Sequence, residues 1–134
     1  SDLGGWNEKV ATSLNNLALL YRDQGRMKEA QKLLEHSLSI VERIFGLEHT
    51  KTALRLSNLA DLLYVQSEYD QAEQFYSRLA RMLEKGHMNV PRSELVSSLN
   101  NYSALLRRTK RTEDANQIES LIQAAKNGGH LPSI

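Results

Sequence analysis

Nearly the same seven-residue phrase occurs three times in this chain of 134 residues. The phrase begins at Leu14, Leu56 and Leu99, where it reads LNNLALL, LSNLADL and LNNYSAL. The copies start 42 and then 43 residues apart. A period of this length is typical of stacked helical hairpins, in which each repeat packs on its neighbours. The sequence therefore predicts a repeat protein whose function lies on a repeated surface.

Apolar residues recur at helical spacing within each repeat, as in Leu14, Leu17, Ala18 and Tyr21. This stripe predicts a helix at about 10–24, and after Gly25 a second stripe runs from Ala30 to Phe45. Further helices are expected near 51–66, 69–85, 92–109 and 112–127, with Gly46, Gly86 and Gly128-Gly129 as stops and Pro91 at a helix start. The predicted fold is all-α, one helical-repeat domain with repeats at about 10–50, 51–91 and 92–127 and a tail at 128–134.

Small residues recur at fixed places in both helices of each repeat. They are Ala18, Ala60 and Ser103 in the first helices and Ala30, Ala72 and Ala115 in the second helices. Small residues that face each other let two helices approach closely, at the low end of the roughly 8–10 Å that is usual for packed pairs. The pattern predicts that the two helices of each repeat pack as a hairpin.

This arrangement resembles the tetratricopeptide repeat. The family pattern falls on Leu14, Leu17, Ala18, Tyr21, Ala30 and Leu34, and again on Leu56, Leu59, Ala60, Leu63, Ala72 and Tyr76. Leucine replaces the usual tryptophan, Tyr64 lies one place away from the position of Tyr21, and the period exceeds the usual 34 residues. The longer form, with the phrases LNNLA, YRDQGRMKEA and FGLEHT, is similar to kinesin light chain repeats. HEAT and armadillo repeats have a similar length but do not predict the paired alanines.

The resemblance implies a right-handed superhelix of three antiparallel helix pairs, an α-solenoid. In that fold the first helix of each pair lines a concave groove, which receives an extended peptide or a helix of a partner. The expected function is that of a non-catalytic scaffold or adaptor that binds a protein or peptide partner.

Helical spacing places several polar residues on the side of the first helices that would line the groove. The candidate binding residues are Asn15, Asn16, Leu19, Arg22, Asn58, Asp61, Tyr64, Asn100, Asn101, Arg107 and Arg108. Asparagine has a low propensity for the middle of a helix. Its recurrence as the row Asn16, Asn58 and Asn101 therefore requires an explanation. Its amides are suited either to the backbone of an extended peptide or to bonds between helices that hold the repeats in register.

Arg22, Arg107 and Arg108 favour an acidic segment or a free C-terminus as the ligand, although Asp23 and Asp61 dilute the positive field. The run from Arg107 to Arg111 is the densest charge cluster, and we interpret it as cations at a helix end rather than a nucleic-acid site. Tyr64 is expected either to pack or to stack on a ligand.

Other classes of function have little support in the sequence. The four histidines are scattered and no catalytic or phosphate-binding motif occurs, so we expect no enzyme, metal or cofactor. The formal net charge of +1 gives no general reason to expect nucleic acid or membrane as a partner. There is no cysteine, no signal-peptide pattern and no membrane-length apolar run. A cytoplasmic location is expected.

Assembly through the ends of the array is the alternative function. The last predicted helix is polar outside Ile118, Leu121 and Ile122, as expected of a cap. The first predicted helix has no such cap, and its apolar face is expected to be covered by Trp6, by an upstream repeat or by a second chain in a homo-oligomer. The absence of an initiator methionine is consistent with a piece of a larger signalling or transport protein.

Overall fold

The computed structural model describes residues 6–85 and 92–126. These residues form the helices α1 (Glu8–Asp23), α2 (Met27–Phe45), α3 (Thr50–Val65), α4 (Tyr69–Glu84), α5 (Arg92–Arg108) and α6 (Thr112–Lys126), and no strand occurs among them. The expected all-α helical-repeat fold is confirmed. The expected stops at Gly86 and Gly128-Gly129, the role of Pro91 and the tail at 128–134 lie outside the described residues.

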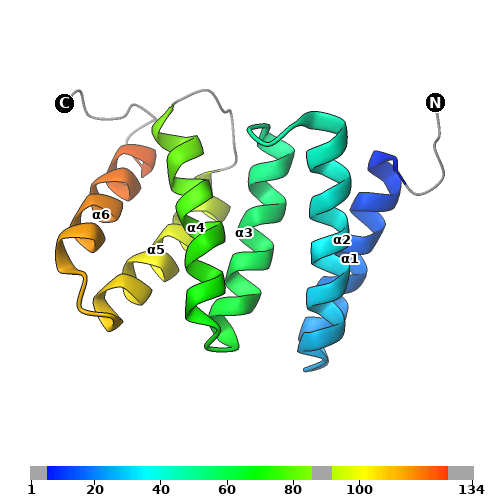
Figure 1. The fold of residues 1–134 in the computed structure, drawn as a ribbon, viewed down its shortest axis with the longest axis horizontal. Coiled ribbons are helices and arrows are strands. Elements are labelled where there is room, and N and C mark those ends of the chain that lie inside the picture. Colours follow the sequence, from blue (N-terminus) through cyan, green and yellow to red (C-terminus); the bar gives the residue numbers. More distant parts are fainter. Residues whose placement is uncertain (1–5, 86–91, 127–134) are drawn as a thin grey trace.

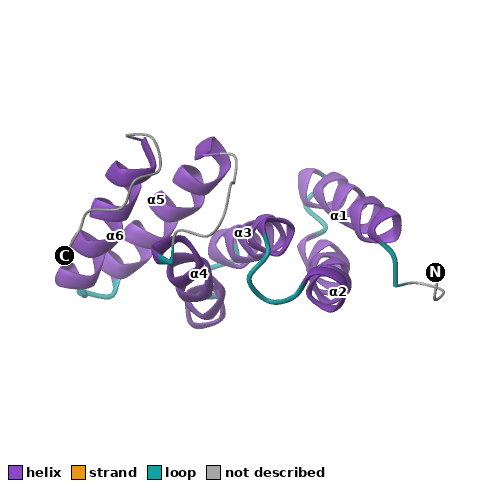
Figure 2. Cartoon of the chain, turned by 90° about the horizontal axis from the view of Figure 1, so that it is seen from above, coloured by secondary structure: helices purple, strands orange, loops and turns teal. Residues whose placement is uncertain are grey.

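The helices pack as three successive pairs, α1 with α2, α3 with α4 and α5 with α6 (Figure 1). Each pair also packs on the next, through α2 against α3 at the first junction and through both α3 and α4 against α5 at the second. Seen from above, α1, α3 and α5 lie toward one side of the array, and α3 is set back between the other two (Figure 2). One surface is therefore built entirely from the first helices of the pairs.

The turn inside each pair has the same backbone geometry in all three repeats. Gly25, Ser67 and Lys110 each adopt a positive φ, of 80°, 62° and 62°. In each turn the following backbone N–H donates to a carbonyl five residues earlier, as from Glu68 to Leu63 at 2.9 Å. This left-handed ending satisfies carbonyls at the end of the first helix. Glycine is the residue that adopts it without strain, yet only the first pair has glycine there.

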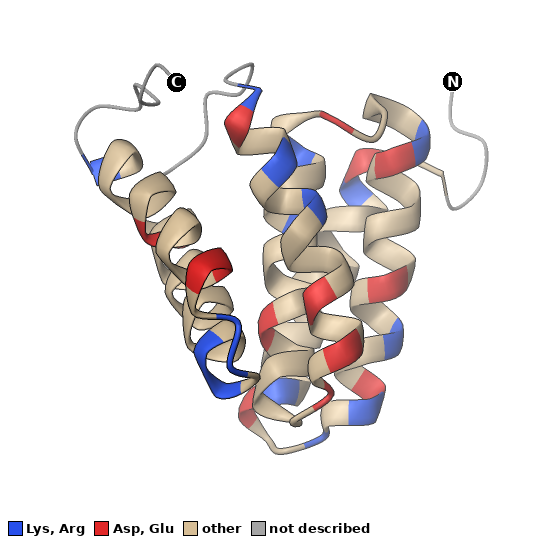
Figure 3. Ribbon diagram, turned by 60° about the vertical axis from the view of Figure 1, so that its left-hand side comes forward, with Lys and Arg blue, Asp and Glu red and all other residues tan. Residues whose placement is uncertain are grey.

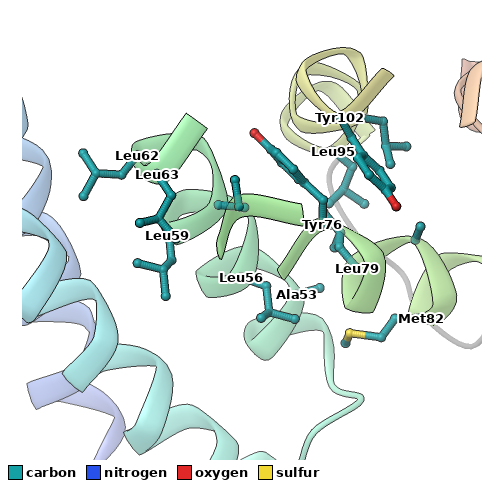
Figure 4. Close-up of a cluster of buried hydrophobic side chains, with 14 of the residues drawn as sticks. Ala53, Leu56, Leu59, Leu62, Leu63, Tyr76, Leu79, Met82, Leu95 and Tyr102 are labelled. Atoms are coloured by element: carbon teal, nitrogen blue, oxygen red, sulfur yellow. The ribbon is translucent and has the colours of Figure 1, made fainter. Parts of the chain in front are cut away.

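The small residues predicted at the hairpin contact are buried at all six places, and Ala18, Ala30, Ala60, Ala72 and Ala115 are completely inaccessible. Larger side chains fill the space between the pairs. In the centre of the array Tyr76 of α4 and Tyr102 of α5 stack with ring centroids 5.4 Å apart (Figure 4). The core is therefore continuous from one repeat to the next, which ties the stability of each pair to that of its neighbour.

Acidic and basic residues are interspersed along the helices (Figure 3). Some of them form ion pairs between repeats, such as Glu42 of α2 with Arg78 of α4 at 2.6 Å, and Glu73 of α4 with Arg111. At the C-terminal end, Ile118, Leu121 and Ile122 of α6 are buried, as the capping role of this helix predicts. Within the described ranges, every helix is too short or too polar to cross a lipid bilayer.

Candidate functional site

A cleft of about 610 Å³ lies across the surface that α1, α3 and α5 form. Its lining residues are Asn15, Leu19, Leu54, Arg55, Ser57, Asn58, Asp61, Ser93, Glu94 and Ser97. All of them belong to the first helices of the three pairs. Asn15, Leu19, Asn58 and Asp61 are thus the predicted site residues that the structure places in this central cleft.

Two of the asparagines in the central cleft are paired with each other. The Asn58 Nδ2 donates to the Asn15 Oδ1 at 3.0 Å and so links α3 to α1. This pairing involves Asn15 rather than Asn16, which is exposed. The Asn15 Nδ2 and the Asn58 Oδ1 have no hydrogen-bond partner among the described residues. One donor and one acceptor are therefore left for another molecule.

Asp61 is the centre of a second polar network, which joins α3, α4 and α5. Its Oδ1 accepts hydrogen bonds from the Tyr76 hydroxyl at 2.5 Å and from the Asn101 Nδ2 at 3.1 Å. Its Oδ2 accepts a bond from the Ser98 hydroxyl at 2.8 Å, and Ser98 also bonds to Ser57. Burial, together with the nearby Asp61 charge, raises the pKa of the Tyr76 phenol far above its ordinary value. This network holds neighbouring repeats in register, the second of the two roles considered for the asparagines.

Arg55 is the cationic residue that lines the central cleft. Its Nε donates to the Ser37 hydroxyl at 3.0 Å, and Ser37 in turn donates to the Ala11 carbonyl oxygen at 2.7 Å. The two terminal nitrogens of the guanidinium have no hydrogen-bond or ion-pair partner among the described residues. Burial lowers the pKa of Arg55, while the Glu8 and Glu94 carboxylates act in the opposite direction. The guanidinium is thus fixed at one end, half-buried, and unpaired at the end that binds carboxylates.

The arginines predicted as attractors of an acidic ligand lie outside the lining and already have partners. Arg22 pairs with its neighbour Asp23 at 3.1 Å. Arg107 donates to Glu119 at 2.6 Å and to Asn116 at 2.9 Å, both on α6. Arg108 lies over the ring of Tyr69, 5.4 Å from its centroid. Their charges are therefore directed to the protein itself rather than to the central cleft.

The other predicted residues also lie outside the lining of the central cleft. Asn100 is exposed, and Asn101 bonds to Asp61. Tyr64 is half-buried, with its ring 5.7 Å from that of Tyr69 and 6.5 Å from that of Tyr76, so its contacts are those of a packing residue.

Sequence reasoning missed Arg55, Glu94 and Ser93 as lining residues. Arg55 interrupts the apolar run around Leu54 and Leu56, and it lies one turn before Asn58 on the same helix face. The charge of Arg55 within this apolar run was the feature of the sequence that could have identified it as a lining residue. Its significance depends on Ser37 of α2 and on the cleft between α1, α3 and α5, both of which arise only when the repeats pack together.

The central cleft offers amide, hydroxyl and guanidinium groups to a ligand, together with the carboxylates of Asp61 and Glu94. Among the residues that the structure describes, no cluster of histidine, aspartate and glutamate has the arrangement needed for a metal ion. The groups that line the cleft can form hydrogen bonds and charge pairs, which suits recognition of a polar chain.

Comparisons with known proteins agree with this architecture. The family model for the tetratricopeptide repeat matches residues 9–85. A solved structure of BtubC (BKLC) from P. vanneervenii matches 96% of this chain and 52% of its own, with a TM-score of 0.77 and 25% identity. A solved structure of the nearly identical TPR-like repeats of a Podosopora anserina putative kinesin light chain has a TM-score of 0.71 at 17% identity, over 92% of this chain and 58% of its own. The resemblance to the fold of kinesin light chain repeats is confirmed.

The curated relatives that this chain matches are much longer than the chain. The RxLR effector protein SFI4 of Phytophthora infestans is 30% identical over 74% of this chain, and human mitochondrial tetratricopeptide repeat protein 19 is 33% identical over 72%. The chain spans 29% and 25% of the lengths of these two relatives. The family model, in contrast, matches more than half of this chain, across its first two helix pairs. The chain therefore belongs to the tetratricopeptide repeat family.

Proposed function

We propose that the central cleft binds an extended peptide segment of a partner protein, and that a carboxylate of this segment pairs with Arg55. Tetratricopeptide repeats generally mediate contacts between proteins. The observation that carries the proposal is the half-buried Arg55 guanidinium, whose terminal nitrogens have no partner among the described residues. Partial burial is costly for a cation, and the Glu8 and Glu94 carboxylates act on Arg55 without forming a direct ion pair, so a carboxylate ligand in contact with the guanidinium offsets more of that cost.

The asparagine pair supplies the second part of the proposed site. The Asn15 Nδ2 and the Asn58 Oδ1 are free to bond with a peptide carbonyl and a peptide N–H. Such bonds hold an extended backbone without reading its side chains. The cleft of about 610 Å³ lies within the size range of typical ligand sites. Arg55 then supplies the preference for an acidic residue, in place of the more distant Arg107 and Arg108.

Selection from a library of random peptides on phage tests this proposal, because the library samples acidic, basic and apolar sequences together. The wild-type chain is the bait, and peptides recovered from it are synthesised and titrated by calorimetry. We expect acidic, extended sequences to be enriched. Arg55→Gln should weaken their binding by about 10-fold or more, because a hydrogen bond to a charged group contributes roughly 1.5–3 kcal/mol.

Two further variants serve as controls. Arg55→Lys keeps the charge but loses the paired N–H donors, so intermediate affinity is expected. Arg108→Gln removes an arginine that lies outside the cleft and should leave the affinity unchanged. Circular dichroism checks that each variant folds. Equal binding of the enriched peptides to the wild type and to Arg55→Gln would contradict the proposal.

The wider proposal is a non-catalytic adaptor that acts through protein contacts. A cytoplasmic location stays an expectation, and one curated relative is named as a mitochondrial protein. The alternative, assembly or self-association through the N-terminal helix face, is favoured by the exposed apolar residues Leu17 and Leu20 of α1. That surface is distinct from the central cleft, and its chemistry indicates a particular kind of occupant.

A further inference from the structure

The helix α1 lies at one end of the array (Figure 1), and two of its leucines are exposed. Leu17 is 39% exposed and Leu20 is 58% exposed. The leucines at the same places in the second pair, Leu59 and Leu62, are 0% and 1% exposed. The same residue type in the same pattern is thus buried in α3 and open in α1. The two helices differ in their packing, because α3 has a helix pair before it in the array and α1 has none among the described residues.

A second helix of the preceding pair belongs to that neighbour in both later pairs, since α2 packs on α3 and α4 packs on α5, and α5 also packs on α3. On α5 the equivalent residues Tyr102 and Leu105 are 6% and 0% exposed. The contact is clearest at Tyr102, whose ring stacks on Tyr76 of α4 (Figure 4). The place of Tyr76 in α4 is the place of Leu34 in α2. An aliphatic or aromatic residue occupies this position in both of the covering helices.

The surface of α1 is also hollowed where a helix would lie. A depression of about 260 Å³ is lined by Lys9, Val10, Ser13, Leu14 and Leu17. Trp6, which was expected as one possible cover, has its ring 4.6 Å from the guanidinium of Arg43 on α2. Leu17 and Leu20 stay exposed with Trp6 in that position.

We infer that this face of α1 is an unfilled inter-repeat interface, and that its occupant is the second helix of another tetratricopeptide-type pair. The occupant carries an aliphatic or aromatic residue at the position of Leu34 and Tyr76. It covers Leu17 and Leu20 as α2 covers α3. The inference concerns a surface other than the central cleft and does not depend on peptide binding there.

The α6 helix of a second copy does not have the chemistry of this occupant. At the position of Leu34 and Tyr76 it carries Glu119, which is exposed and bonded to Arg107 and Ser103. Head-to-tail stacking of two copies would place this carboxylate against apolar α1, where desolvation of a charge is costly. The occupant is therefore a non-terminal second helix, and homo-oligomerisation becomes an outcome that the test can detect.

Duplication of the first helix pair tests the inference directly. A copy of residues 8–49 is placed before Glu8, in place of residues 1–7, which preserves the 42-residue period and seats an α2 helix on the original α1. The extended chain then contains two copies of Leu20, one covered and one at the new open end. Thermal unfolding is followed by circular dichroism for both chains and for Leu20→Gln variants.

We expect the extended chain to unfold at a higher temperature than the original. Leu20→Gln at the covered copy should lower the midpoint by roughly 5 °C or more, as a buried polar substitution does. The same substitution at the open copy, and in the original chain, should lower it by less than about 2 °C. The open copy is a matched control, because residue and helix are the same.

Two results would overturn the inference. The first is an equal effect of Leu20→Gln at both copies, which means that the added helix does not seat on α1. The second is a concentration-dependent dimer of the original chain in light scattering that Leu20→Gln abolishes, which makes a second copy the occupant. A monomeric original chain supports the inference.

Discussion

The Tyr76 hydroxyl on α4 donates a hydrogen bond of 2.5 Å to the Asp61 carboxylate on α3. Because Asp61 also accepts bonds from Ser98 and Asn101 on α5, this tyrosine helps to fix the charge that connects the second and third repeats. A hydrogen bond to a carboxylate in a partly buried site is among the stronger polar contacts in proteins. The junction between these two repeats therefore depends on a polar network as well as on apolar packing.

Removal of the Tyr76 hydroxyl should destabilise the fold. Tyr76→Phe leaves the ring stack with Tyr102 but deprives Asp61 of a donor, so we expect a loss of about 1–3 kcal/mol in the free energy of unfolding. Tyr102→Phe is the matched control, because the Tyr102 hydroxyl has no hydrogen-bond partner among the described residues. Urea denaturation measures both. Equal losses in the two variants would show that the bond to Asp61 contributes nothing specific.

Stability should fall in alkaline solution through the same tyrosine. The pKa of Tyr76 is raised by burial first and by the Asp61 charge second, so the folded state holds the phenolic proton more tightly than the unfolded state does. The resulting stability is present below the ordinary tyrosine pKa of about 10 and is lost as the pH rises above it, by about 1.4 kcal/mol per pH unit.

Urea denaturation across this pH range checks the effect. Tyr76→Phe should flatten the decline, and Tyr102→Phe should flatten it less. Burial also raises the pKa of Tyr102, but its hydroxyl makes no bond to a carboxylate among the described residues. A decline that is unaltered in Tyr76→Phe would exclude this residue as its source.

The positive φ in the second and third turns gives a stabilising prediction. Ser67 and Lys110 both have a φ of 62°, a conformation that costs an L-residue about 1 kcal/mol and glycine little. Ser67→Gly and Lys110→Gly should each raise the free energy of unfolding by up to about 1 kcal/mol, reduced by the greater entropy of glycine in the unfolded chain. Gly25→Ala should act in the opposite direction, because Gly25 has a φ of 80°. Thermal or urea unfolding of the three variants measures these shifts, and destabilisation by both glycine substitutions would contradict the argument.

At the C-terminal pair, Glu119 should titrate below the usual range for glutamate. Hydrogen bonds from Arg107 and then Ser103 lower its pKa, because they favour the charged form. Any stability from this pairing is present above the ordinary glutamate pKa and is lost as the pH falls through the lowered value. Both side chains are largely exposed, so solvent screening keeps that contribution small. NMR titration of the Glu119 carboxyl carbon measures the pKa directly, and Arg107→Ala should raise it. A midpoint that does not move in Arg107→Ala would contradict this pairing in solution.

The helices and their grouping were predictable because they depend on local rules. The threefold phrase, the apolar spacing and the paired small residues are periodic, and the observed helices begin and end within a few residues of the predicted positions. The buried face of α6 was predictable for the same reason, since Ile118, Leu121 and Ile122 stand apart from a polar background. Asn15, Leu19, Asn58 and Asp61 were placed in the cleft by helical spacing alone.

The polar contacts around the central cleft were less predictable, because they depend on which partner each polar group finds within the protein. Arg107 and Arg108 are cationic in the sequence, but α6 and Tyr69 engage them in the structure. In the sequence, Arg55 is distinguished by no more than its charge within an apolar run. Its role depends on a hydrogen bond to Ser37 from the neighbouring pair.

For this protein the sequence by itself determined the fold class, the repeat and the helix faces, because helical periodicity and side-chain size act between residues a few places apart. Only the tertiary structure decided which asparagines pair, which arginine stays unpaired in the central cleft, and which leucines remain open on α1. Those outcomes depend on contacts between residues about 18 to 43 positions apart. Hydrogen bonds and burial are set by three-dimensional distance, which a one-dimensional pattern does not contain.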